Sequence, residues 1–172
     1  MRQRTSTLVC FLLLSVIVAA QDPSVKDFEA PKKNPKSEKE FKKSEADLLK
    51  AVLWLETTPI DTGSLKRTTM NAWVLMWMSD CPYITFSIDA NISTVLFDKN
   101  ADLMMVWLGG IARQCLGNNN AFDPLKANTA GVKAAINCYQ LGGQINADED
   151  LDKAIVADKE GKLEDWVKEV MK

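Results

Sequence analysis

The sequence predicts an all-α protein, an irregular bundle of about six helices with one short extended segment near residues 83–88. Along most of the chain, apolar residues recur at intervals of three and four, the period of an amphipathic helix. Serine, aspartate and asparagine stand before several of these runs, and glycine or proline follows them, as helix starts and stops do. Only residues 83–88 alternate at the period of a strand. Because an isolated strand is unstable, we expect this run to be an extended segment packed against helices.

Residues 1–20 have the features of a signal peptide. A basic start contains Arg2 and Arg4, an apolar run covers residues 8–18, and small residues precede Gln21. As a helix this run would span about 16–20 Å, whereas a bilayer core is roughly 30 Å thick. We therefore predict an exported protein that begins at Gln21 and has no membrane span in its mature chain. The expected location is periplasmic or extracellular, in a Gram-negative bacterium.

Residues 21–36 are predicted to form a flexible leader. The segment is rich in lysine and proline, and its only large apolar side chains are Val25 and Phe28. So little apolar surface does not offset the conformational entropy that is lost on ordering. Residues 37–172 are then expected to form a single helical domain, which is long enough to bury a sizeable core.

The first helix is predicted over residues 38–56. Ser37 and Glu40 have the spacing of a capping box, and Pro59 stands where the helix should end. A second helix is predicted over residues 65–80. Its apolar residues cover more than one narrow stripe, so we expect it to be buried on two sides.

A short helix over residues 92–97 precedes the predicted central helix, residues 101–116. The central helix is apolar on almost every side, so we expect the other helices to surround it. Asn100 is the expected cap at its start. Gly109 and Gly110 lie in its interior, where each glycine costs about 1 kcal/mol relative to alanine. We therefore expect a close helix crossing or a kink at these glycines.

Three further helices complete the predicted bundle. Asp123 and Pro124 combine a cap with a proline at the first helical position, and Gly142 closes the helix that they start. Asp148 is the expected cap of a short helix. A last amphipathic helix follows Gly161.

The chain contains no histidine, which narrows the chemistry available to it. Histidine is the usual general base near neutral pH and the most common metal ligand. Ser-His-Asp catalysis and His-based zinc sites are therefore excluded. Residues 146–157 depart from the EF-hand pattern at both defining positions, so we predict no metal site and no cofactor. The 23 acidic residues outnumber the 21 basic ones, which argues against a nucleic-acid partner.

An apolar pocket is the first candidate site. Tryptophan and methionine are concentrated in two of the predicted helices, residues 65–80 and 101–116, and the second of these contains the paired glycines. Such side chains usually fill a core, but they also suit a pocket for an apolar ligand. The residues that we single out for this pocket or for core packing are Trp73, Trp77, Met104, Trp107, Gly109 and Gly110.

Three cysteines follow the signal peptide, namely Cys81, Cys115 and Cys138. In an exported protein one disulfide and one free thiol can occur, and the sequence does not choose among the three pairings. Cys115 and Cys138 lie on consecutive predicted helices and are the pair to test first. The alternative is that all three are small buried apolar residues.

Carboxylates near the ends of the first two helices are a further candidate site. Glu56, Asp61 and Asp80 lie at these ends together with Arg67, and two carboxylates can share acid and base roles. The alternative is ordinary surface charge. Separately, Asn91 begins a glycosylation sequon, which matters only if the host pathway glycosylates asparagine.

Three stretches carry a resemblance to a known family. The first is AVLWLETTPID, the second is Arg67 with NAWVLMWMSDCP, which begins at Asn71, and the third is LDKAIVADKEGKLEDWVKEV. Over about residues 45–172 the chain resembles a family of secreted helical proteins of Bacteroidota that has no known function. The resemblance implies an exported, helix-rich domain. It implies no activity, cofactor or catalytic residue.

Together, these patterns favour a non-enzymatic exported binding or interaction domain. The sequence does not identify its partner, for which another protein is one candidate. Two alternatives stay open. One is a carrier of an apolar small ligand in a Trp/Met-lined cavity. The other is a carboxylate-based hydrolase, which a deep cleft with two acids about 5–10 Å apart would favour.

Overall fold

The structure is a computed structural model that describes residues 23–172. The predicted signal peptide, residues 1–20, lies outside the described residues. The helices in chain order are α1 (Pro23–Lys26), α2 (Glu38–Thr57), α3 (Leu65–Asp80), α4 (Ala90–Phe97), the 3₁₀ turn η1 (Ala101–Leu103), α5 (Met104–Gly117), α6 (Pro124–Leu141), α7 (Glu149–Lys159) and α8 (Leu163–Val170). No strand occurs within residues 23–172, which confirms the prediction of an all-α bundle.

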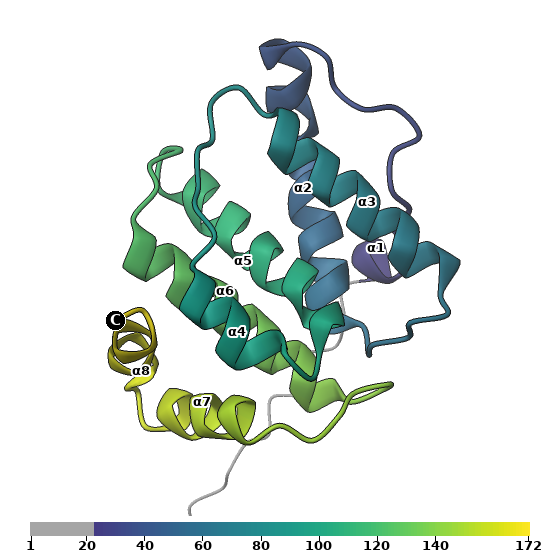
Figure 1. The fold of residues 1–172 in the computed structure, drawn as a ribbon. Coiled ribbons are helices and arrows are strands. Elements are labelled where there is room, and N and C mark those ends of the chain that lie inside the picture. The colour runs from purple at the N-terminus through teal and green to yellow at the C-terminus, as the bar shows by residue number, and fades with distance from the viewer. Residues whose placement is uncertain (1–22) are drawn as a thin grey trace, which may run out of the picture.

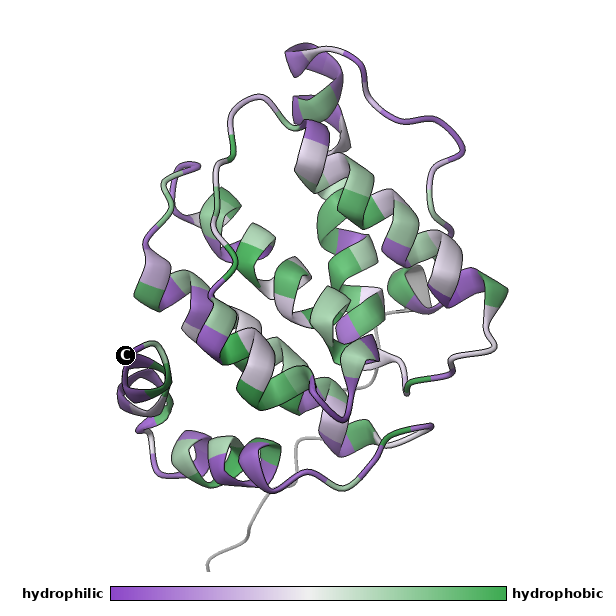
Figure 2. Cartoon of the chain, in the orientation of Figure 1, coloured by the Kyte–Doolittle hydropathy of each residue, from purple (hydrophilic) through white to green (hydrophobic). Residues whose placement is uncertain are grey.

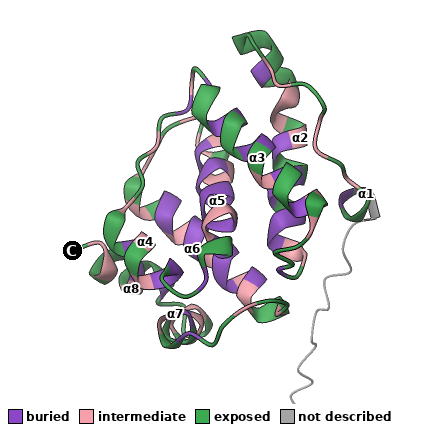
Figure 3. Cartoon of the chain, turned by 45° about the vertical axis from the view of Figure 1, so that its right-hand side comes forward, coloured by how far each residue is buried: buried purple, intermediate pink, exposed green. Residues whose placement is uncertain are grey.

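The helices pack in two groups around α5. Helices α2 and α3 lie side by side, and α5 and α6 form the most extensive helix pair (Figure 1). Helices α7 and α8, at the C-terminal end of the chain, pack against α6. Apolar residues concentrate on the inward faces of α2, α3, α5 and α6 (Figure 2). Burial is nearly continuous along the middle of α5, from residue 106 to residue 112 (Figure 3). This placement confirms that residues 101–116 form the central helix, although the first turn is a 3₁₀ turn.

Glycines allow α5 and α6 to approach closely, as the paired glycines predicted. A Cβ atom added to Gly110 would lie 2.8 Å from the carbonyl oxygen of Ala130. A Cβ atom added to Gly131 would lie 2.7 Å from the carbonyl oxygen of Trp107. Real Cβ atoms do not approach other atoms this closely, so the crossing needs glycine on both helices.

Most of the predicted caps form, but the capping box of α2 is only half present. The side chains of Asp123 and Asp148 accept hydrogen bonds from the backbone at the starts of α6 and α7, as predicted. The Ser37 side chain makes no cap bond. Glu40 does reach back, but it accepts from the backbone N–H of Lys36 at 2.7 Å.

Asn100 does not cap the central helix, contrary to the prediction. Asn100 is buried, and its side-chain amide bonds instead to the loop before α7, which is distant along the chain. Its Nδ2 donates to the carbonyl of Asn146 at 3.1 Å, and its Oδ1 accepts from the backbone N–H of the same residue at 2.8 Å. The side chain therefore joins the start of α5 to the loop before α7.

The segment at residues 83–88 is an unpaired connection between α3 and α4, as expected. Ile84 is buried and Phe86 packs against the core. Ile88, the third member of the predicted inward face, is instead 56% exposed. The segment leaves the core before α4 begins. In the described part of the chain the sole β-type contact is an isolated bridge between Ile60 and Gly143.

The described part of the predicted leader is packed against the bundle. Val25 is only 4% exposed, and the Phe28 ring lies against the core. Residues 27–36 then cross alongside α3 and lead into α2 (Figure 1); we call this segment the strap. The flexibility that the sequence suggests stays a prediction, but two apolar side chains anchor the segment. No helix within residues 23–172 has the length and apolar character to cross a membrane.

Candidate functional site

The tryptophans singled out from the sequence belong to separate packing clusters. Trp77 of α3 packs edge-on against Phe41 and Tyr83, with ring centroids 5.4 and 6.4 Å away. Its indole N–H donates to Ser44 Oγ at 2.7 Å. Trp107 of α5 packs against Phe97, with ring centroids 5.3 Å apart. Both rings are almost completely buried, so they fill the core between different helices.

The other predicted pocket residues on α5 also take part in packing. Met104 is half-buried, and Gly109 and Gly110 are buried. A Cβ atom on Gly109 would lie 3.1 Å from the side chain of Val52 of α2, which shows how closely α2 approaches there. The described contacts of these residues are thus with neighbouring helices.

Trp73 lies in a different environment, in the wall of a hollow between the strap and helices α2 and α3. The hollow has a volume of about 670 Å³. Its apolar lining comes from Trp73, Pro31 and Pro35, and its charged lining includes Lys33, Lys36 and Asp47. The hollow is largely open to solvent, and other surface hollows of about 440–520 Å³ occur on the described chain. We take this one as the candidate functional site because its lining combines apolar and charged side chains from three segments.

Most of the residues that form this hollow were not predicted. We expected residues 21–36 to be flexible, and a flexible segment cannot form a wall. The signal in the sequence was the pair Val25 and Phe28, whose side chains hold the segment in place. Two apolar residues are too weak a pattern to predict docking without the positions of α2 and α3.

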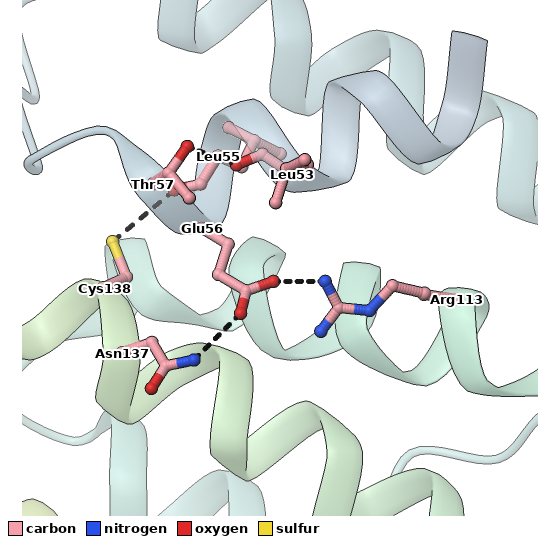
Figure 4. A network of polar contacts seen from close by, with 7 residues as sticks. All are labelled: Leu53, Leu55, Glu56, Thr57, Arg113, Asn137 and Cys138. Carbon is pink, nitrogen blue, oxygen red and sulfur yellow. Dashed lines mark hydrogen bonds and ion pairs between the residues drawn. The ribbon is translucent and has the colours of Figure 1, made fainter. Parts of the chain in front are cut away.

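A second polar cluster joins α2, α5 and α6 (Figure 4). The Glu56 carboxylate forms an ion pair with Arg113 and accepts a hydrogen bond from Asn137 Nδ2 at 3.0 Å. Glu56 is only 7% exposed, so little water reaches its carboxylate and Arg113 balances the charge. Both contacts of the carboxylate are with side chains of neighbouring helices, which suits a structural role. The cluster ties three helices together.

Arg67 is buried at the start of α3, next to this cluster. Its Nη2 donates to the carbonyl oxygens of Thr58 and Pro59 at 2.6 and 3.2 Å. The guanidinium group also lies 5.4 Å from the ring centroid of Trp54. Burial lowers the pKa of Arg67, while the nearby Cys138 and two carboxylates partly oppose this shift. Arg67 thus fixes the turn between α2 and α3.

The predicted carboxylate site does not assemble around a cleft. Glu56 faces Arg113 and Asn137. The Asp61 carboxylate accepts from the backbone N–H of Gly63 at 3.1 Å, which is a local turn contact. Asp80 ends α3 and is exposed. The contacts made by Glu56 and Asp61 therefore do not bring two acids together around a substrate.

The three cysteines are buried thiols in the described chain, and the disulfide proposed between Cys115 and Cys138 is absent. The geometry explains this correction. Helices α5 and α6 run in opposite directions and cross near Gly110 and Gly131, so the two cysteines extend away from the crossing on opposite sides. At 1.5 Å per residue they are roughly 18 Å apart along the helix axes, too far for a disulfide.

Burial also makes the cysteines on α5 and α6 poor nucleophiles. It raises the pKa of Cys115, and it raises the pKa of Cys138 to about 11, although Arg67 partly offsets the second shift. Cys138 Sγ points to the carbonyl oxygen of Leu55 at 3.5 Å. Because the thiolate is the reactive form, these thiols are suited to packing.

Neither the arrangement of metal-binding side chains nor a similarity to known proteins points to a second site in the described residues. Within residues 23–172 no group of three or more Cys, Asp or Glu side chains is arranged to hold a metal ion. Comparisons with protein-family models, with curated proteins and with solved structures found no match. The function must therefore be argued from the hollow and the chemistry of its lining.

Proposed function

We propose that the protein is a non-enzymatic binding domain that acts after export, in the periplasm or outside the cell. The observation that carries the proposal is the hollow of about 670 Å³ between the strap and helices α2 and α3. It combines an aromatic wall with charged side chains, the mixture that small-molecule and peptide sites use for affinity and orientation. Export is supported by the signal-peptide pattern of residues 1–20.

The internal polar groups support a binding role over a hydrolytic one. Glu56 is neutralised by Arg113, and the Cys138 thiol is buried with a raised pKa. Hydrolysis by a carboxylate pair needs one acid held protonated near a second carboxylate. The described contacts of Glu56 do not include such a partner.

Export and binding are tested together on protein recovered from its host after secretion. N-terminal mass analysis is expected to give a chain that starts at Gln21. Native mass spectrometry of the same sample is expected to show a fraction carrying a bound small molecule or peptide. Retention of residues 1–20 would contradict export.

A panel of ester, glycoside and peptide substrates tests the enzymatic alternative. We expect no turnover above the rate of heat-inactivated protein. Turnover that is abolished by Glu56→Gln, with the fold intact by circular dichroism, would contradict the non-enzymatic proposal. Asp98→Asn, an exposed carboxylate outside the cluster, is the matched control.

A further inference from the structure

We infer that the hollow beneath the strap binds a short zwitterionic peptide, with its ammonium group toward α2 and its carboxylate toward the strap. The inference rests on the proposed binding function and specifies its site and ligand class. Three features carry it: unpaired charges of opposite sign on the two walls, an apolar surface between them, and a covering segment that is anchored at its ends.

The charges on the two walls lack partners within the described chain. Lys33 and Lys36 lie on the strap, and no ion pair joins either ammonium group to a residue within 23–172. Asp47 lies on the α2 side and is half-buried, with neither an ion pair nor a hydrogen bond to the described residues. Because no side chain of the described residues pairs with it, the Asp47 carboxylate is free to pair with a ligand ammonium group.

The second carboxylate in the lining, Glu40, is already engaged. Its Oε2 accepts from the backbone N–H of Lys36 at 2.7 Å, which fixes the end of the strap over the start of α2. Asp47 is therefore the carboxylate available to a ligand. The strap supplies the opposite charge, so the two walls orient a molecule that carries both an ammonium and a carboxylate group.

The apolar lining favours a ligand with an apolar side chain. Trp73 borders the hollow together with Pro31 and Pro35. The Trp73 indole N–H is buried and has no hydrogen-bond partner in the described chain, although a buried indole usually has one. Protein atoms cover this nitrogen, so a ligand in the hollow would contact the edge of the Trp73 ring and not its N–H group. A volume of about 670 Å³ accommodates more than one amino-acid residue, which favours a short peptide over a free amino acid.

The strap is held at both ends and is irregular between them. At one end, Lys66 of α3 forms an ion pair with Glu29 at 3.0 Å and donates to the carbonyl of Lys26 at 3.3 Å. Further along, Asn34 Nδ2 lies 3.7 Å from Met76 Sδ, a weak contact. The segment between these anchors has no regular backbone bonding, so it can adjust around a ligand while its ends stay docked.

Calorimetric titration of the exported protein with leucyl-leucine tests the inference. We expect saturable binding that weakens with added salt, because charge pairs are screened. Free leucine is expected to bind more weakly. The same dipeptide with its amino group acetylated and its carboxyl group amidated is expected to bind at least threefold more weakly, because both charge pairs are lost.

Variants of the lining identify the site. Asp47→Asn and the double variant Lys33→Gln/Lys36→Gln are each expected to weaken leucyl-leucine binding three- to tenfold. Lys32→Gln is the matched control, since this exposed lysine of the same strap does not line the hollow.

Two results would overturn the inference. One is the absence of leucyl-leucine binding. The other is binding that is equally strong for the blocked dipeptide or for the Asp47→Asn variant. Neither result contradicts the broader binding function, which the native mass of the secreted protein tests by itself.

Discussion

At the scale of single residues, Gly131 of α6 lies directly against Trp107 of α5, with no room for an added Cβ atom. We predict that Gly131→Ala lowers the free energy of unfolding by about 1–3 kcal/mol, because overpacking a core forces neighbouring groups to shift. The added Cβ would lie 2.7 Å from the Trp107 carbonyl oxygen, and a backbone atom cannot rotate away. Urea denaturation followed by circular dichroism measures the change.

Gly117→Ala is the matched control for that variant. Gly117 is also helical, but a Cβ atom there meets nothing within 4 Å. Alanine is preferred to glycine in a helix by about 0.5–1 kcal/mol, so this variant should be neutral or slightly stabilising. If both variants lost the same stability, crowding against Trp107 would not explain the result at Gly131.

The ion pair between Glu56 and Arg113 gives a second prediction at the residue scale. Arg113→Leu is expected to cost about 1–3 kcal/mol, because it leaves a buried carboxylate with only one partner, Asn137. The side chain of Arg113 is 36% exposed, so the full cost of breaking a buried pair does not apply. In the double variant Glu56→Gln/Arg113→Leu the loss should be smaller than the sum of the two single losses. Additive losses in a denaturation cycle would contradict coupling.

At the scale of elements, docking of the N-terminal segment depends on one buried side chain. We predict that Val25→Ala weakens docking by about 1–2 kcal/mol through the loss of buried methyl groups. Val25 is buried although α1 is only one turn long. Limited trypsin digestion should then cut at lysines of the strap faster than in the parent protein, because local opening exposes the backbone.

The control for this variant is Val156→Ala on α7, a valine that is largely exposed. Its digestion at the strap should match that of the parent protein. Equal acceleration in both variants would indicate global destabilisation and would count against local docking through Val25.

The helices of the bundle could be predicted because each has a local signal in the sequence. Asp123 before Pro124 marks the start of α6, and the apolar period marks the face that it buries. The role of Asn100 could not be predicted, because its partner Asn146 is distant along the chain. The candidate site was missed for the same reason. Its walls come from the strap, α2 and α3, and no local pattern places Asp47 and Lys33 in the lining of the same hollow.

At the scale of the whole molecule, burial of the cysteines determines how fast their thiols react and how the stability of the bundle changes with pH. All three thiols after the predicted signal peptide are buried and none forms a disulfide in the described chain. A thiol reagent at pH 8 should therefore modify them only as fast as the protein opens. Rapid modification of the native protein would contradict this burial.

The same burial predicts that the folded molecule loses stability in alkali. Burial raises the pKa of Cys138 from 9.0 to about 11 in the folded chain. Between these two values the unfolded chain has released the thiol proton and the folded chain retains it, so raising the pH favours unfolding. Two pKa units correspond to about 2–3 kcal/mol, a loss that should begin near pH 9 and be complete near pH 11.

Denaturation midpoints between pH 9 and pH 11 measure this loss of stability, with Cys138→Ala for comparison. The variant removes the titrating group, so its stability should fall less steeply with pH than that of the parent, even if its stability at pH 7 is lower. Parallel curves for the two proteins would show that other groups cause the alkaline loss.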